Sequence, residues 1–436
     1  MSENEEKEKF DLKHTFLIGL MFFPTILAWE MYDSQVSISL YFYLGSLALV
    51  GLILGLDNLL GLIIQPIMGN KSDNTRSRLG RRMPYLIIGV PIAAIFFALI
   101  AFETSLFMLL LFIFCFMIAM CFYRTQQVAL IPDFIKSEHR GKANAILNLM
   151  GGVGAILAAL ISLLIVDVSL QLAFIIVSVI LIITLIIGFL TVKEQDAYAY
   201  QLCLEMDKEE YAESEDAIAR PGLIESLKDI ASEKDKSTLL ILLAIFSVYI
   251  GYEGFRALFT IYGTEVLGMT RGAAGGMLLY AALVFLIMAL PSAILAEKFG
   301  RRLMIKIGLV IFILAMLLAF LVQGTGILLI VLVLIGIGYA FVNINTLVTL
   351  WSLAPSEKKI GTYTGVYYFF MYTAAILGPG IVGAIVEVVG FTYFFLVCAL
   401  FLILALVFML LVTREEIQLT EEEKLARKKF IEKMEK

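Results

Sequence analysis

Charge and histidine are scarce in this sequence. Of its 436 residues only 16% are charged and two are histidines, whereas 61% are hydrophobic. Soluble proteins carry about 25% charged and about 45–50% apolar residues, so a water-soluble globule is excluded because its core could not hold this surplus. The two histidines, His14 and His139, stand at the edges of apolar runs. Histidine is therefore excluded as a proton-binding group in the middle of a helix.

Motifs for several kinds of chemistry are also missing. The four cysteines follow no disulfide or metal-ligand spacing. No Gly-x-x-x-x-Gly-Lys-Ser/Thr phosphate loop occurs, which argues against ATP as an energy source, and no nucleophile–base set points to an enzyme. We expect no cofactor, no metal site and no nucleic-acid partner. The first nine residues are highly charged, unlike a signal peptide, so the first apolar run is expected to stay in the protein.

What the sequence has instead is twelve long apolar runs. A helix needs about 20 apolar residues to cross a bilayer. Runs of this kind cover 15–42, 46–68, 84–103, 106–131, 142–166, 170–192, 238–266, 273–296, 303–323, 326–352, 361–387 and 391–413. They predict an all-α membrane protein with twelve transmembrane helices, surrounded by the lipid bilayer, and we expect a monomer.

A polar stretch divides these helices six and six. The predicted parts are an N-terminal segment 1–14, a first six-helix bundle 15–192, a linker 193–237, a second six-helix bundle 238–413 and a tail 414–436. Small residues mark some of the helices, among them Gly51 and Gly55 in the second and Gly380 and Gly383 in the eleventh. Small residues let helix backbones approach closely in lipid, so these positions predict close packing between helices.

Lysine and arginine gather in the loops on one side of the predicted bundle. The loops that follow the even-numbered helices carry Lys71, Arg76, Arg78, Arg81, Arg82, Lys136, Arg140, Lys142, Lys298, Arg301, Arg302, Lys306, Lys358 and Lys359. The loops on the other side carry Arg271 and almost nothing else. Basic loops face the cytoplasm. The bias predicts a multi-pass protein of the plasma or inner membrane, with the linker and both termini in the cytoplasm.

Two of these basic loops have related sequences in corresponding places. Residues 69–82 read GNKSDNTRSRLGRR, and residues 296–302, about half a chain later, read AEKFGRR. The repeat indicates that the chain arose by duplication. The first loop resembles the signature loop of the major facilitator superfamily, with matches at Gly69, Asp73, Gly80, Arg81 and Arg82.

This resemblance implies the major facilitator fold of two pseudo-symmetric six-helix bundles, which transports a solute by exposing a central site to either side in turn. It also implies that the loop holding Asp73 acts as a gate that closes the cytoplasmic side. The second copy keeps Gly300, Arg301 and Arg302 but has Glu297 in place of the aspartate, so it is expected to act more weakly.

Further residues resemble one branch of this superfamily. Gln65-Pro66 before the loop, Pro84-Tyr85 after it, Arg124 followed by Asp133, and the run 263–268 (GTEVLG) are similar to the sucrose:proton symporters. Residues 75–78 (TRSR) are similar to the glycoside–pentoside–hexuronide cation symporters. The paired aspartates of those cation symporters are replaced here by Gln65, which argues against sodium coupling of their type.

Six ionisable residues stand out within the predicted helices, away from the helix ends. They are Glu30, Asp33, Asp57, Arg124, Glu253 and Arg256. Burying such groups in a membrane costs about 2.5–3.5 kcal/mol each on insertion scales, so they are expected to face a cavity. The resemblance places helices 1, 4, 7 and 10 around that cavity.

An acid that meets Arg124 in one conformation and loses it in another would bind and release a proton. We rank Asp33 and Glu30 first for this role and Asp57 second. Sodium, held by the same oxygens, stays open as the alternative coupling ion. A permanent ion pair between Glu253 and Arg256, three residues apart on one helix face, is an alternative role for those two.

The expected substrate is a small molecule, a sugar such as a disaccharide or glucoside taken up with protons. Sugar binding needs hydrogen-bonding groups beside an aromatic face, and Trp29, Asn343 and Tyr372 are the candidates. Two alternatives remain. An exporter of drugs or metabolites shares the fold, although the Gly-Pro pair typical of drug antiporters is missing from helix 5. A non-transporting membrane sensor would bind a ligand without flux.

Overall fold

The computed structural model describes residues 12–135, 139–197, 199–201, 204, 230, 235–353 and 360–414. Within these residues, twelve helices are long and apolar enough to cross a membrane. The predicted all-α membrane fold is confirmed. The cysteine at 203 and most of the predicted linker and tail lie outside the described residues.

The first half consists of six long helices. They are α1 (Leu12–Leu44), α2 (Leu47–Asp73), α3 (Met83–Ile100), α4 (Leu106–Phe134), α5 (Arg140–Ile161), which continues as the π-helical turn η2 (Ser162–Val166), and α6 (Leu170–Thr191), followed by the 3-10 turn η3 (Glu194–Asp196).

The second half repeats this plan. Its helices are α9 (Ser237–Glu265), α10 (Arg271–Phe299), α11 (Arg301–Leu321), α12 (Thr325–Ser352), α13 (Ile360–Val389) and, after the 3-10 turn η5 (Phe391–Tyr393), α14 (Phe394–Leu411). We call the side on which α6 ends and α9 begins the linker side, and the other the opposite side.

Hydroxyl side chains begin several of these helices on the opposite side. Ser46, Ser105, Ser169 and Thr270 each precede a helix and accept a hydrogen bond from the backbone N–H three residues later. Such N-caps satisfy donors that the first helical turn leaves free. The loops on the opposite side can therefore be short, and consecutive helices run antiparallel.

Helix α2 is longer than the apolar run that predicts it. The run ends near residue 68, whereas the helix continues through Asn70, Lys71 and Ser72 to Asp73. Hydropathy detects only the part of a helix that lies in lipid. The extra polar turn carries the start of the signature loop out of the bilayer and toward α3.

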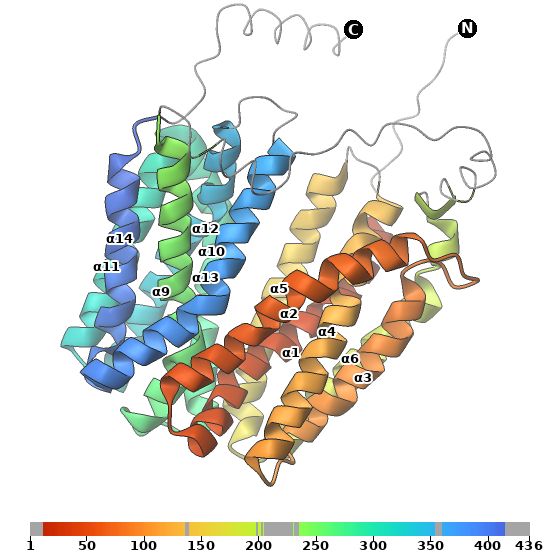
Figure 1. Ribbon diagram of the computed structural model, residues 1–436, viewed down its shortest axis with the longest axis horizontal. Helices are drawn as coiled ribbons and strands as arrows, with labels where there is room; N and C mark the ends of the chain where they lie inside the picture. Colours follow the sequence, from red (N-terminus) through yellow and green to blue (C-terminus); the bar gives the residue numbers. More distant parts are fainter. Residues whose placement is uncertain are drawn as a thin grey trace, which may run out of the picture.

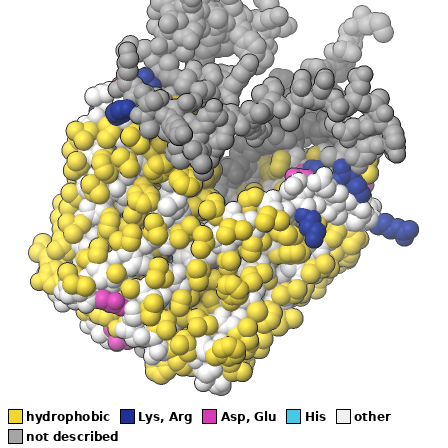
Figure 2. Space-filling view, viewed as in Figure 1, with side chains coloured by type: hydrophobic (Ala, Val, Ile, Leu, Met, Phe, Trp, Pro, Cys, Tyr) yellow, Lys and Arg dark blue, Asp and Glu magenta, His cyan; other side chains and the backbone are white. Residues whose placement is uncertain are grey.

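On the face shown in Figure 2, apolar side chains cover both halves, and charged side chains are concentrated near the ends of the halves. Large exposed residues include Leu164, Ile287 and Leu290, which are 67%, 67% and 69% exposed. An apolar surface of this extent is unstable in water. It is the surface that lipid covers.

The halves lie side by side and meet most closely where α2 crosses α13 on the opposite side (Figure 1). The small residues predicted to pack closely make this contact. Gly51 faces the backbone of Pro379, Gly55 faces that of Ile376, and Gly383 faces that of Leu47. Each approach leaves no room for a side chain, so the two helix backbones touch.

Candidate functional site

A cavity lies between the halves and opens toward the linker side. It has a volume of about 560 Å³, within the range of about 300–1,000 Å³ that is usual for small-molecule sites. Its inner end is formed by Trp29, Asp57 and Arg124, and its outer end by Asn70 and Asp73 of the last turn of α2. A second space of about 220 Å³ adjoins it and reaches α9; Trp29, Asn58, Arg124 and Tyr372 line both.

One guanidinium group holds three carboxylates at the inner end of this space. Arg256 of α9 lies 3.1 Å from Glu30 and 2.8 Å from Asp33, both on α1, and 3.0 Å from Glu253 on its own helix. The local pair of Glu253 and Arg256 therefore exists but is only part of a larger cluster. Three negative groups around one positive group repel each other in a low-dielectric site, which favours uptake of a proton or another cation.

Asp33 is the most enclosed of these acids, at 6% exposure. Its Oδ2 atom is buried and receives no hydrogen bond, because the approach of Arg256 is an ion pair without hydrogen-bond alignment. Asp57, on α2, is also buried, and its carboxylate accepts hydrogen bonds from the backbone and side-chain nitrogens of Asn58. Asp57 lines the larger space, whereas Asp33 lines neither space and is connected to the smaller one through Arg256.

Arg124 has a different environment from Arg256. Its guanidinium carbon lies 4.5 Å from the centre of the Trp29 ring, at the spacing of a cation–π contact. No described carboxylate lies within ion-pair distance of it. The structure therefore brings together the predicted residues Trp29 and Arg124. In this conformation the acids of α1 form ion pairs with Arg256 and not with Arg124.

Of the remaining predicted ligands, one lines the cavity and one does not. Tyr372 of α13 lines both parts of the cavity. Asn343 of α12 donates hydrogen bonds to the hydroxyl groups of Tyr249 and Tyr339, at 2.9 and 3.0 Å, and is not part of the cavity wall. Tyr249, which sequence reasoning did not single out, lines the smaller space.

Polar contacts between the halves close the opposite side. Arg271 at the start of α10 donates to the Gln35 carbonyl, at 2.6 Å, and to the Ser39 hydroxyl, at 3.0 Å, both on α1. Asp167, after η2, accepts from the Thr270 hydroxyl, at 2.5 Å, and from the Gly272 backbone, at 2.8 Å. An acid at the beginning of a helix is favourable for the helix dipole. Sequence reasoning missed Asp167 because its partner is 103 residues away.

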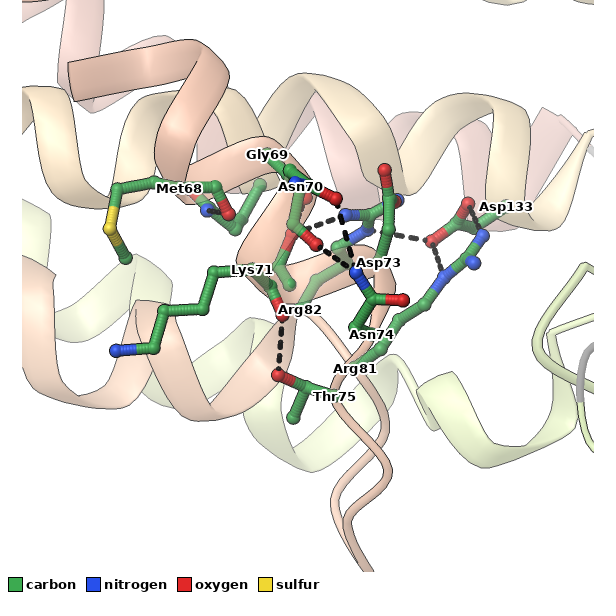
Figure 3. A network of polar contacts seen from close by, with 12 residues as sticks. Met68, Gly69, Asn70, Lys71, Asp73, Asn74, Thr75, Arg81, Arg82 and Asp133 are labelled. Atoms are coloured by element: carbon green, nitrogen blue, oxygen red, sulfur yellow. Dashed lines mark hydrogen bonds and ion pairs between the residues drawn. The ribbon is translucent and has the colours of Figure 1, made fainter. Parts of the chain in front are cut away.

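On the linker side, the predicted gating loop forms a charge network within the first half (Figure 3). Arg81 binds Asp133 of α4 through two nitrogens, at 3.0 and 2.5 Å. Arg82 donates to Asp133, at 3.1 Å, and also to Ser72 and Asp73 at the end of α2. The two arginines are 8% and 5% exposed. They tie the ends of α2 and α4 to the loop.

A second acid, Glu194, completes the network and was not predicted. It follows the end of α6, and its carboxylate accepts hydrogen bonds of 2.7–2.9 Å from the backbone N–H groups of Arg81, Arg82 and Met83. Burial raises the pKa of Glu194, and the charge of Asp133 adds to this, although the three N–H groups favour the carboxylate. A lone acid after an apolar run gives no signal of this role.

The glycines and the second copy of the loop have simpler surroundings. Gly80 has a positive φ of 99° and faces Glu194, so a side chain there would be strained and would collide. Gly69 lines the cavity. Gly300, also at positive φ, ends α10 and begins α11. Arg301 opens α11, and Arg302 donates to the Thr413 carbonyl, at 3.3 Å.

A sequence profile described as Major Facilitator Superfamily matches residues 18–281 and 241–434. The chain belongs to the major facilitator superfamily. Its members are secondary transporters of small solutes, not enzymes, and this facilitator is one of them. A comparison with curated protein sequences gives no match.

Solved structures show the same fold at low sequence identity. A bacterial homologue of the human lysosomal transporter Spinster, in an inward-facing and occupied conformation, has 17% identity and a TM-score of 0.70; the match covers 92% of this chain and 96% of that one. The nucleoside transporter NupG has 15% identity and a TM-score of 0.68, with 92% and 100% covered. A POT family transporter in complex with a thioalcohol-conjugated peptide has 15% identity and a TM-score of 0.67, with 90% and 95% covered.

Proposed function

We propose that this facilitator takes up a sugar together with protons, by alternating access. The observation that carries the proposal is the cluster of Glu30, Asp33 and Glu253 around Arg256, at the inner end of a cavity between the halves. Acids inside a membrane protein mark ion or proton pathways. The sugar assignment is supported by the sequence resemblance to the sucrose:proton symporters and by the aromatic residues Trp29 and Tyr372 in the wall.

Alternating access follows from the asymmetry between the two sides. The excess of Lys and Arg in the loops of the linker side supports a cytoplasmic position for that side, and with this orientation the cavity described above would open inward. The cluster joins α1 of one half to α9 of the other. Protonation of Asp33 would weaken the attraction of Arg256 and let the halves part on the opposite side. The pair Glu253–Arg256 belongs to one helix and would persist.

The test is uptake of labelled sucrose, maltose and simple glucosides into proteoliposomes, with and without an inward proton gradient. The proposal expects one sugar to accumulate when the gradient is present. A sodium gradient at constant pH tests the other coupling ion. Folded, inserted protein that moves none of these sugars would refute the assignment to a neutral sugar and turn the search toward charged sugars, other metabolites and export.

Asp33→Asn tests the coupling residue. The variant keeps the shape of the side chain but cannot exchange a proton, so it should keep sugar exchange and lose uphill uptake. Glu253→Gln is the control, since it removes a charge from the same guanidinium without breaking the connection between the halves. Undiminished uphill uptake by the Asp33 variant would remove Asp33 from the mechanism.

A further inference from the structure

The cavity contains two arginines, and only one is neutralised. Arg256 is surrounded by three carboxylates. Arg124 lines both parts of the cavity, yet within the described chain no acid pairs with it. The nearest candidate, Asp57, interacts with it electrostatically but stays beyond 4.0 Å and is engaged by Asn58. A buried or half-buried charge without a partner is costly, so a partner is expected from outside the chain.

The surroundings of Arg124 orient it for such a partner. The Trp29 ring covers one face of the guanidinium at 4.5 Å, which restrains the group without consuming its N–H donors. A guanidinium presents five donors in a planar fork that matches the two oxygens of a carboxylate or phosphate. Asn58, Gln65 and Thr125 line the same cavity and offer neutral hydrogen-bonding groups nearby.

We propose that the transported solute carries a carboxylate or phosphate group, which Arg124 binds in the cavity while the neutral side chains around it hold the rest of the molecule. The proposal specifies the substrate class of the site described under "Proposed function". It rests on that function only in treating the site as a transport site. For a sugar, it means an acidic sugar. A neutral sugar would leave the charge of Arg124 without a counter-ion, and it would have to compete with the guanidinium group for the face of the Trp29 ring.

The chain offers its own reporter for binding. It contains two tryptophans, Trp29 and Trp351, and the second is exposed at the linker end of α12, where it donates to the Thr364 hydroxyl. In Trp351→Phe protein, all tryptophan fluorescence comes from the ring beside Arg124. The fluorescence is then titrated with glucose, glucuronate and glucose 6-phosphate at constant ionic strength. These ligands share one sugar ring and differ in whether carbon 6 carries no negative group, a carboxylate or a phosphate.

Glucuronate, glucose 6-phosphate or both should bind saturably and at least about tenfold more tightly than glucose; which of the two binds decides between carboxylate and phosphate. Arg124→Gln should weaken that anion by about tenfold to a hundredfold and leave glucose unchanged. Arg124→Lys, which keeps the charge without the fork, should fall between. Arg78→Gln is the matched control, because it removes the same charge from an exposed loop position on the same side.

The proposal is overturned if glucose binds as tightly as the anions, if neither anion binds, or if Arg124→Gln binds the anion normally. Its failure is separate from that of symport. Proton-driven accumulation of a neutral sugar would uphold symport and refute the anion. Anion binding that depends on Arg124, without gradient-driven uptake, would uphold the anion and refute symport.

Discussion

Adding one methyl group to Gly383 should open the side of the molecule that is closed in this structure. A Cβ atom at this position of α13 would lie 2.5 Å from the backbone oxygen of Leu47 on α2, whereas ordinary contact begins at 3.4 Å. The obstacle is backbone, so it cannot rotate away, and α2 and α13 must separate by roughly 1 Å. Overpacking of this kind costs about 1–3 kcal/mol.

That cost applies only to the conformation in which α2 and α13 touch. The equilibrium should therefore shift by about fivefold to 150-fold toward conformations open on the opposite side. Spin labels on cysteines at Val168 and Val388 report this opening, because they lie on that side in different halves and are 79% and 86% exposed. The native cysteines are replaced first. Pulsed electron resonance should show a longer distance growing at the expense of the shorter one.

Gly365→Ala is the control for this experiment. It lies on the same helix, but its Cβ would meet nothing within 4 Å. Both variants gain the same helix propensity, about 1 kcal/mol relative to glycine, so a difference between them comes from the contact with α2. If the two variants give the same distance distribution, the close approach of the backbones does not control opening and the reasoning is refuted.

Three further predictions follow from the polar contacts. Arg256→Met leaves buried Asp33 without its cation and should lower stability by about 3–5 kcal/mol; thermal unfolding measures this, and adding Asp33→Asn should restore part of it, so full additivity of the two changes would argue against their pairing. Burial raises the pKa of Glu194, so the folded state holds the proton of this carboxyl more tightly than the unfolded state does. The stability of the native protein relative to Glu194→Gln should therefore fall as pH rises from the unfolded to the folded pKa, and should stay level above it. If the melting temperatures of the two proteins change with pH in parallel through this range, the prediction is wrong. Asp167→Ala removes the carboxylate that accepts hydrogen bonds from Thr270 and Gly272 across the opposite side. It should shift the equilibrium between closed and open conformations toward opening by about 1.5–3 kcal/mol, whereas an unchanged spin-label distance distribution would mean that this carboxylate does not hold the side closed.

The sequence predicts the membrane helices well because hydropathy depends on local composition, and each of the twelve runs overlaps one of the twelve candidate membrane helices of the described residues. It is less informative where partners come from distant segments. Spacing alone indicates that Glu253 and Arg256 share a helix face, but the arrival of Glu30 and Asp33 depends on how α1 packs against α9. The same limit applies to Arg124, because no spacing in the sequence indicates that its guanidinium lies over Trp29; its meeting with an acid in another conformation stays a prediction.

Helix extent shows a second limit. The polar end of α2 is helical through Asp73 because the chain leaves the apolar layer before the helix stops. Glu194 lies in a segment whose composition suggests only a linker, and its role comes from three N–H groups more than 110 residues away. Neither feature leaves a pattern in hydropathy or charge.

The charge network of Arg81, Arg82, Asp133 and Glu194 has a thermodynamic consequence that depends on where its members lie. All four belong to the first half, and a rigid movement of one half against the other leaves distances within each half unchanged. Whatever free energy the network contributes is then present in both end states and cancels from their difference. Asp73 also pairs with Arg82, but its side chain is 55% exposed at the mouth of the cavity, and we propose that it, unlike buried Asp133 and Glu194, exchanges partners between states. We therefore propose that the buried carboxylates of Asp133 and Glu194 stabilise the fold of the half, whereas the exposed carboxylate of Asp73 takes part in its motion.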